Sequence, residues 1–112
     1  MGTPHPAPDL LPGTLDLLVL RTLLCGRMHG YGITQFLRTS SDDVLQVGES
    51  SLYPALQRLL LNGWVSAEWG VSDNNRRARY YTLTAAGRKR LSTERQEFER
   101  LVLAMRKVLN SA

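Results

Sequence analysis

The chain has 112 residues, 43% of them hydrophobic and 21% charged, with a formal net charge of +4 and one cysteine. This length and composition predict one globular domain and exclude both extensive disorder and a framework of internal disulfides. No stretch approaches the roughly 20 apolar residues that cross a bilayer, and the N-terminus lacks the basic and apolar blocks of a signal peptide. We therefore expect a cytoplasmic protein whose basic excess permits an anionic partner.

The chain begins with a segment that should not form regular structure. Three prolines within residues 1–11 disfavour helix in their neighbours, so we expect a loose N-terminal arm. Pro12, Gly13 and Thr14 then predict the start of a first helix, with Thr14 as its N-cap and an end near Leu24. Apolar residues cover most of the circumference of this helix, which predicts that a partner chain covers part of it.

A second, short helix is predicted to open at residues 29–32, and a polar loop and a brief extended segment at Val44–Val47 should follow it. Residues 48–64 then predict a third helix, capped by Ser50 or Ser51 and ended by Gly63, with Pro54 in or next to its first turn. The leucines of this stretch form one apolar face. The other residues can hydrogen-bond to base edges or touch a thymine methyl, and they are Ser50, Ser51, Tyr53, Pro54, Gln57 and Arg58.

A β-hairpin is predicted after the third helix. Residues 64–69 and 79–83 have strand composition, and the turn formers of residues 70–75 join them. Arg76, Arg77 and Arg79 form a basic cluster at the tip and on the return strand, from which they could reach a nucleic-acid backbone. Arginines at a hairpin tip can also serve solubility alone, and most polar helix faces are merely solvated, so neither surface identifies a DNA site by itself.

The last predicted helix runs from residue 84 to about residue 110. Its apolar residues recur at three- and four-residue steps on one side, and at about 38 Å it would overhang so small a body. The basic residues 88–90 near its start should be solvated, although they follow the hairpin closely and could reach phosphate. We expect a second subunit to cover the overhang, with a dimer interface formed by Leu17, Leu18, Phe98, Leu101, Val102, Met105 and Val108.

The order of three helices, a hairpin and a long helix predicts a mainly α winged helix-turn-helix, with N- and C-terminal helices that dimerise. The DNA-binding domain would span residues 12–83 and the dimerisation helix residues 84–112. The chain resembles the PadR family of transcriptional regulators, in its smaller subgroup with a single C-terminal helix. The residues that carry the resemblance are Gly30-Tyr31, residues 51–56 with Arg58-Leu59 and Gly63, and residues 80–87. The chain departs from the family pattern at Gly32, where glutamate is common, and at Leu60 and Leu61, where charged residues are usual.

The resemblance implies a homodimeric repressor of a pseudo-palindromic operator, whose half-sites lie about 34 Å apart. It also implies that the dimer core can open into a pocket for an apolar or aromatic small-molecule effector, to which Met105 would adapt. The rival interpretation is a winged-helix module that binds protein instead of DNA, because a fold does not determine its function.

The sequence predicts neither an enzyme nor a metal site. Cys25 and His29 are four residues apart, but two ligands do not complete a zinc site, and His5 lies in the expected loose arm. A glycine-rich phosphate loop, a Gly-x-Ser-x-Gly motif and paired carboxylates in an apolar setting are all missing from the sequence. We therefore expect no catalytic residues and no cofactor.

Overall fold

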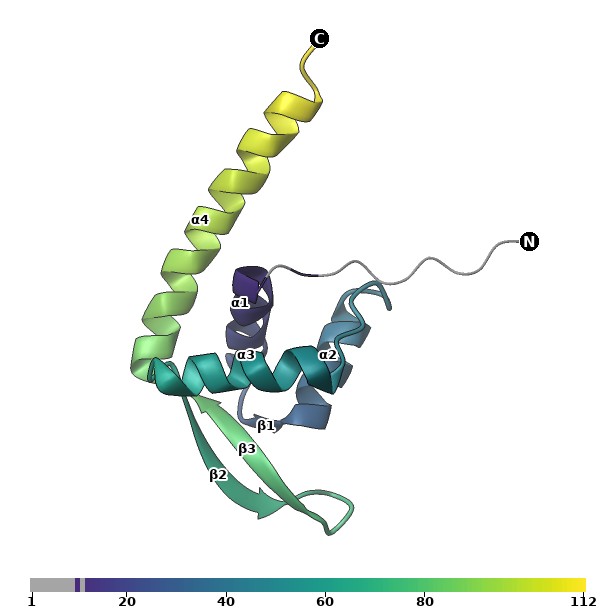
Figure 1. Cartoon of the computed structure of the whole chain (residues 1–112), viewed down its shortest axis with the longest axis vertical. Helices are drawn as coiled ribbons and strands as arrows, with labels where there is room; N and C mark the ends of the chain where they lie inside the picture. The colour runs from purple at the N-terminus through teal and green to yellow at the C-terminus, as the bar shows by residue number, and fades with distance from the viewer. Residues whose placement is uncertain (1–9, 11) are drawn as a thin grey trace, which may run out of the picture.

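The computed structural model describes Leu10 and residues 12–112, so the expected arm of residues 1–11 lies outside the described part except for Leu10. The described chain has the predicted order of three helices, a hairpin and a long helix, which confirms the mainly α winged helix-turn-helix fold (Figure 1). One short strand is added before the second helix. The elements are α1 (Pro12–Leu23), β1 (Met28–His29), α2 (Gly30–Ser40), α3 (Glu49–Leu61), β2 (Val65–Val71), β3 (Arg77–Leu83) and α4 (Ala85–Leu109).

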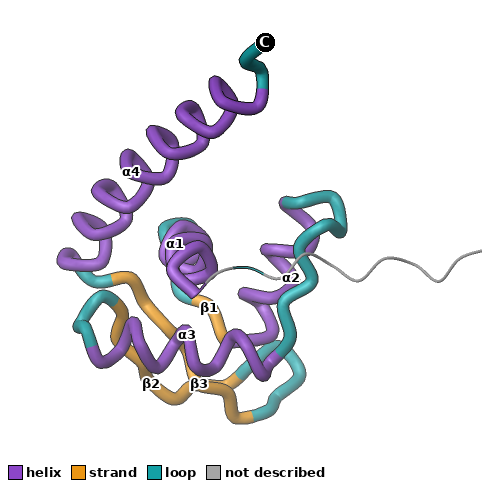
Figure 2. Tube along the Cα trace, turned by 45° about the horizontal axis from the view of Figure 1, so that its top comes forward, coloured by secondary structure: helices purple, strands orange, loops and turns teal. Residues whose placement is uncertain are grey.

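Helix α1 lies at the centre of the fold, and in Figure 2 it is seen almost end-on with α2, α3 and the start of α4 around it. Its residues Val19, Leu20 and Leu23 are almost fully buried. Leu17 is only 8% exposed, and Leu18 packs against the same core. The expectation that a partner must cover α1 is therefore wrong for Leu17, because the other elements of the same chain already enclose it.

Helices α2 and α3 begin differently from each other. His29 caps α2, since its Nδ1 accepts a hydrogen bond of 2.9 Å from the Gly32 amide. Helix α3 begins at Glu49, with Gly48 as an N-cap that offers no side-chain hydrogen bond, so neither Ser50 nor Ser51 is the cap. Pro54 consequently lies inside α3, where its missing N–H leaves the Ser50 carbonyl without its helical partner.

Three antiparallel strands form a sheet in the order β1-β3-β2. Met28 pairs with Tyr81 at one edge of β3, and Ala67 pairs with Tyr81 at the other. The hairpin of β2 and β3 is confirmed, and it projects away from the helices (Figure 1). Residues 44–48 form no strand, and the additional strand is β1.

Helix α4 is joined tightly to the end of α3. The Thr84 hydroxyl accepts the Gly87 amide at 3.0 Å and donates to the Gly63 carbonyl at 2.7 Å. A Cβ on Gly87 would lie 2.0 Å from the Trp64 carbonyl oxygen, so this approach requires glycine. Beyond Leu91, the last buried residue of α4, the helix leaves the body on the side opposite the hairpin (Figure 1). No helix in the described part is long and apolar enough to span a membrane.

Candidate nucleic-acid interface

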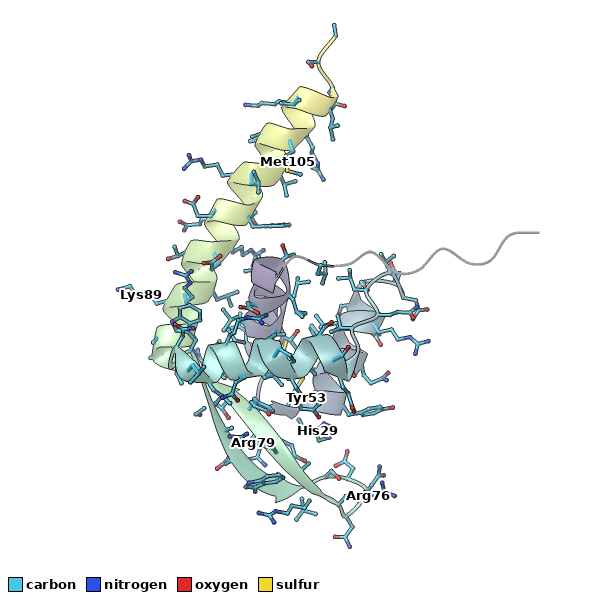
Figure 3. The ribbon with its side chains drawn as sticks, viewed as in Figure 1. His29, Tyr53, Arg76, Arg79, Lys89 and Met105 are labelled. Carbon is cyan, nitrogen blue, oxygen red and sulfur yellow. The ribbon has the colours of Figure 1, made fainter. Side chains whose placement is uncertain are left out.

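A cleft of about 950 Å³ lies between the start of α2, one side of α3 and the hairpin. Figure 3 shows Tyr53 and His29 together below α3, Arg79 on the hairpin beside them, and Arg76 at its tip. The lining is mainly aromatic and basic, with Asp73 as its one acidic residue, and its three arginines suit an anionic partner. Its principal residues are His29, Gly30, Tyr31, Tyr53, Trp69, Arg76, Arg77, Arg79 and Tyr81.

The hairpin arginines keep their charge available. Within the described residues, none of Arg76, Arg77 and Arg79 forms an ion pair with a carboxylate. The Arg77 guanidinium carbon lies 4.3 Å from the centroid of the Trp69 ring, although this indole is 60% exposed. A stacked arginine is held in place without losing its charge. The hairpin therefore presents three uncompensated positive charges, at least one of them pre-oriented.

Tyr81 forms the buried end of the cleft. Its phenol is 4% exposed, and burial raises its pKa above the usual 10.0, although the nearby Arg79 acts in the opposite direction. The Arg79 guanidinium carbon lies 5.8 Å from the centroid of the Tyr81 ring. Tyr81 is therefore uncharged at neutral pH, and its ring provides an apolar surface beneath Arg79.

The α3 residues that were expected to contact DNA bases lie on different sides of the helix. Ser50, Pro54 and Gln57 are exposed, and none of the three lines the cleft. Tyr53 is 47% exposed and does line the cleft, together with the hairpin arginines. Ser51 is also exposed, but it borders a smaller hollow shared with Leu15 of α1. The structure therefore brings Tyr53 and the three arginines together at one cleft, and the other expected α3 residues lie outside it.

Arg58 is placed differently from the sequence expectation. Its guanidinium donates to both carboxylate oxygens of Asp16 in α1, at 2.8 and 3.1 Å. These hydrogen bonds raise the pKa of Arg58 above its ordinary value. The side chains of Arg58 and Asp16 are 40% and 19% exposed. Arg58 thus faces α1 because it lies on the flank of α3 nearest that helix, and its charge is already paired.

The model of the Transcriptional regulator PadR-like family matches residues 19–93, more than half of the chain. The chain belongs to this family. Members of this family are transcriptional regulators and not enzymes, as the sequence predicts.

Two solved regulators and one curated protein illustrate the similarity. Protein X of Lysinibacillus sphaericus is 35% identical over 85 residues, which are 75% of this chain and 77% of that protein. A transcriptional regulator of Clostridium thermocellum is 29% identical, with a TM-score of 0.78 over 85% of this chain and 92% of its own. A PadR family transcription regulator of Clostridium difficile shares the fold, with 24% identity and a TM-score of 0.74 over 86% of this chain and 98% of its own.

Several residues that line the cleft of this PadR-like chain are not among the predicted DNA-binding residues, and Trp69 and His29 are two of them. The sequence predicts a strand at Trp69 and no further role, whereas the structure stacks its ring against Arg77. The predicted hairpin could have indicated a role for Trp69, because pairing its two strands places Trp69 directly opposite Arg79. The sequence places His29 at the opening of the second helix and assigns it no metal site, and the structure shows that its imidazole caps α2. Among the described residues, no three His, Cys, Asp or Glu side chains gather where they could share a metal ion.

The opposite face of the sheet holds the hairpin against the body. Arg27 forms an ion pair with Glu68 of β2, and its guanidinium carbon lies 4.2 Å from the centroid of the Tyr80 ring in β3. The Tyr80 hydroxyl donates to the Val71 carbonyl at 3.1 Å. These contacts link both strands to the segment before β1. They therefore help to hold the hairpin in its direction, in addition to the connections at its two ends.

Helix α4 of the PadR-like chain carries most of the expected dimer interface. Leu91 of its apolar stripe is buried in the core, and the same stripe continues outward along the uncovered part of the helix. Of its expected members, Val102 is partly buried, whereas the exposed ones are Phe98, Leu101, Met105 and Val108. An effector pocket at this stripe stays a prediction, because two chains would form its walls.

The basic residues at the start of α4 lie away from the cleft. Lys89 points outward, on the side of the molecule away from Tyr53 and Arg76 (Figure 3). Arg90 forms an ion pair with Glu94 and stacks on the Trp64 ring. Arg90 is therefore engaged within its own chain, and Lys89 provides an exposed charge that is remote from the cleft.

Proposed function

We propose that this PadR-like chain acts in the cytoplasm as a homodimeric transcriptional repressor that binds a pseudo-palindromic DNA operator. The observation that supports DNA binding is the cleft in which Tyr53 of α3 stands beside the hairpin arginines Arg76, Arg77 and Arg79. Arginines without acidic partners favour a polyanion, because no internal ion pair must be broken before they bind phosphate.

In the proposed complex, α3 enters the major groove and the hairpin follows the DNA backbone. Tyr53, Gln57 and Ser50 supply hydroxyl and amide groups for base edges or phosphates, and Pro54 offers an apolar contact for a thymine methyl. Ser51 would serve only at the edge of this surface. Arg58 is not included as a DNA contact, since Asp16 already binds its guanidinium.

Dimerisation through α4 would supply the second half of the DNA-binding surface. The exposed stripe of Phe98, Leu101, Met105 and Val108 is a continuation of the face that packs against the protomer's own core. Burying such side chains stabilises association by about 25 cal/mol per Å² of apolar surface removed from water. An apolar or aromatic effector bound at the stripe would release DNA by changing the angle between the two winged domains.

The rival proposal is a winged-helix module that binds protein. A protein partner would have to supply carboxylates for the three hairpin arginines, whereas DNA offers a regular row of phosphates. The two alternatives predict different effects of salt on DNA binding and different effects of the DNA sequence. Binding to DNA should weaken with salt for every fragment, with an additional preference for the operator.

The test is a fluorescence-anisotropy titration with DNA from upstream of the protein's own gene, at about 50 and about 200 mM salt. If the dimer neutralises on the order of 6 to 10 phosphates, affinity should fall by about 10³ to 10⁵ between these concentrations. The double variant Arg77→Ala/Arg79→Ala should bind all fragments more weakly and with a shallower salt slope. Lys89→Ala removes a charge outside the cleft and should leave the slope unchanged.

Two results would contradict the proposal at different points. Absence of any anisotropy change at low salt would reject DNA binding and favour the protein-binding module. Wild-type binding by the Arg77→Ala/Arg79→Ala variant would remove the hairpin from the interface but leave α3 in it. Sedimentation equilibrium of the same samples tests the dimer independently of DNA.

A further inference from the structure

Gly30, the first residue of α2, lies against the side chain of Tyr53 in α3. Gly30 is buried, and a Cβ built on it would lie 3.0 Å from the Tyr53 hydroxyl oxygen, 3.4 Å from Cζ and 3.6 Å from Cε1. A contact of 3.0 Å to a Cβ is unusually tight, whereas 3.4 to 4 Å is ordinary van der Waals contact, so the hydroxyl would be the atom displaced. The phenol of Tyr53 therefore rests directly on the Gly30 backbone.

The backbone itself does not require glycine at this position. Gly30 is not among the residues with positive φ, whereas Gly26 and Gly63 are. Alanine is also the better helix former, so a substitution should favour α2 if only the backbone mattered. The requirement for a residue without a side chain comes from the neighbouring Tyr53.

Tyr53 can move without unfolding the protein. Its side chain is 47% exposed, and the exposed part faces the cleft that also contains Arg77 and Arg79. A methyl group at Gly30 would push the ring toward this open space and not into the core. The effect of the substitution should therefore appear in the position of the hydroxyl before it appears in stability.

We propose that Gly30 is a positioning residue and that Tyr53 is a specificity-determining residue for DNA. The missing side chain of Gly30 seats the phenol so that its hydroxyl occupies one defined place in the cleft, within reach of a base edge or phosphate. This inference rests on the proposed function. It assigns Gly30, the first residue of α2, a role in seating a side chain of α3.

The experiment compares Gly30→Ala, Tyr53→Phe and the double variant Gly30→Ala/Tyr53→Phe by anisotropy with operator DNA. Gly30→Ala should weaken operator binding about tenfold or more, the loss expected for one displaced recognition group. Tyr53→Phe should also weaken binding. The double variant should bind as Tyr53→Phe does, because without the hydroxyl the nearest ring atom is Cζ at an ordinary contact distance of 3.4 Å. Gly13→Ala is the control, since its Cβ would meet nothing within 4 Å.

Melting temperature separates positioning from a general loss of structure. Gly30→Ala should melt at the wild-type temperature or above it, as a helical alanine does. A second readout uses protein labelled with 3-fluorotyrosine, in which the Tyr53→Phe variant identifies the Tyr53 fluorine signal. This signal should shift in Gly30→Ala and stay in place in Gly13→Ala.

The proposal is overturned if Gly30→Ala binds operator like the wild type, if the losses of the two single variants add in the double variant, or if the Tyr53 signal does not shift. These outcomes differ from failure of the proposed function itself. A wild-type chain that binds no DNA at low salt would reject DNA recognition, while the fluorine signal would still report whether Gly30 seats the ring.

Discussion

The pair of Asp16 and Arg58 links the proposed reading helix to the centre of the protomer, and it allows a decisive substitution. Arg58→Ala removes two charge-assisted hydrogen bonds, at 2.8 and 3.1 Å, between α3 and α1. It also leaves the Asp16 carboxylate, whose side chain is 19% exposed, without its partner. If Arg58 links the two helices, Arg58→Ala should lower the free energy of unfolding and leave the number of phosphates bound by the dimer unchanged.

The expected magnitude follows from the exposure of the pair. Fully exposed ion pairs contribute about 0.2 to 1 kcal/mol, and hydrogen bonds to charged groups about 1.5 to 3 kcal/mol. Because the Arg58 side chain is 40% exposed, solvent screening reduces the upper value. We expect Arg58→Ala to lower the free energy of unfolding by about 1 to 2 kcal/mol, or about 4 to 8 °C in melting temperature.

The assays are thermal unfolding at fixed protein concentration and anisotropy over a range of salt. A phosphate contact by Arg58 in each subunit would reduce the salt slope by about 1.8 when removed, whereas the internal pair predicts an unchanged slope. In a double-mutant cycle with Asp16→Ala, the two stability losses should not add. Gln57→Ala, at the neighbouring exposed position, should alter DNA affinity and leave stability unchanged. A clearly shallower slope for Arg58→Ala, with wild-type melting, would refute the assignment.

Three further outcomes are expected. Gly87→Ala should prevent stable folding in a circular-dichroism melt, because its Cβ would lie 2.0 Å from the backbone oxygen of Trp64, whereas Ala86→Ser on the exposed side should melt normally. Leu101→Glu should dissociate the dimer in sedimentation equilibrium and Leu103→Glu, on the other side of α4, should not; equal effects would argue against the stripe. Burial raises the pKa of Tyr81, so its stabilising contribution is fully present below the unfolded value of 10.0 and is lost as the pH rises through the folded one. The free energy of unfolding, measured by denaturation at about pH 9 and about pH 11, should therefore fall less between these two pH values for Tyr81→Phe than for the wild type.

The joint between the hairpin and α4 gives the family motif at residues 80–87 a physical meaning. Tyr81 is buried at the base of the cleft, and Thr84 both caps α4 and bonds to the end of α3. Gly87 allows the first turn of α4 to approach the backbone of Trp64. The motif thus anchors the proposed dimerisation helix to the hairpin and to α3 at a single point, so that a change in the angle of α4 would reach both of the proposed DNA-binding elements.

The positions and types of the main elements were predictable because they depend on local patterns. The apolar spacing of 48–64 and of the last helix and the turn formers of the hairpin act over a few residues. Their predicted bounds lie close to those observed. The loose grouping of arginines at the hairpin was visible for the same reason, since Arg76, Arg77 and Arg79 are neighbours in sequence.

The errors share a dependence on contacts between distant residues. Strand β1 has two residues and exists through its pairing with Tyr80 and Tyr81, which no local pattern reveals. The start of α3 is a local exception, because the helix begins at Glu49, two or three residues before the start that a cap at Ser50 or Ser51 predicts.

By itself, the sequence determined the winged helix-turn-helix order, the family resemblance and the basic hairpin, because these reside in periodicity and in adjacent residues. Only the tertiary structure decided which side chains share the cleft. Arg58 and Asp16 are separated by 42 positions, and the rotation of α3 against α1 turns this arginine toward the aspartate. The same packing sets Tyr53 against Gly30 and faces it toward the hairpin, since the side of a helix that meets a neighbour depends on how the whole core closes.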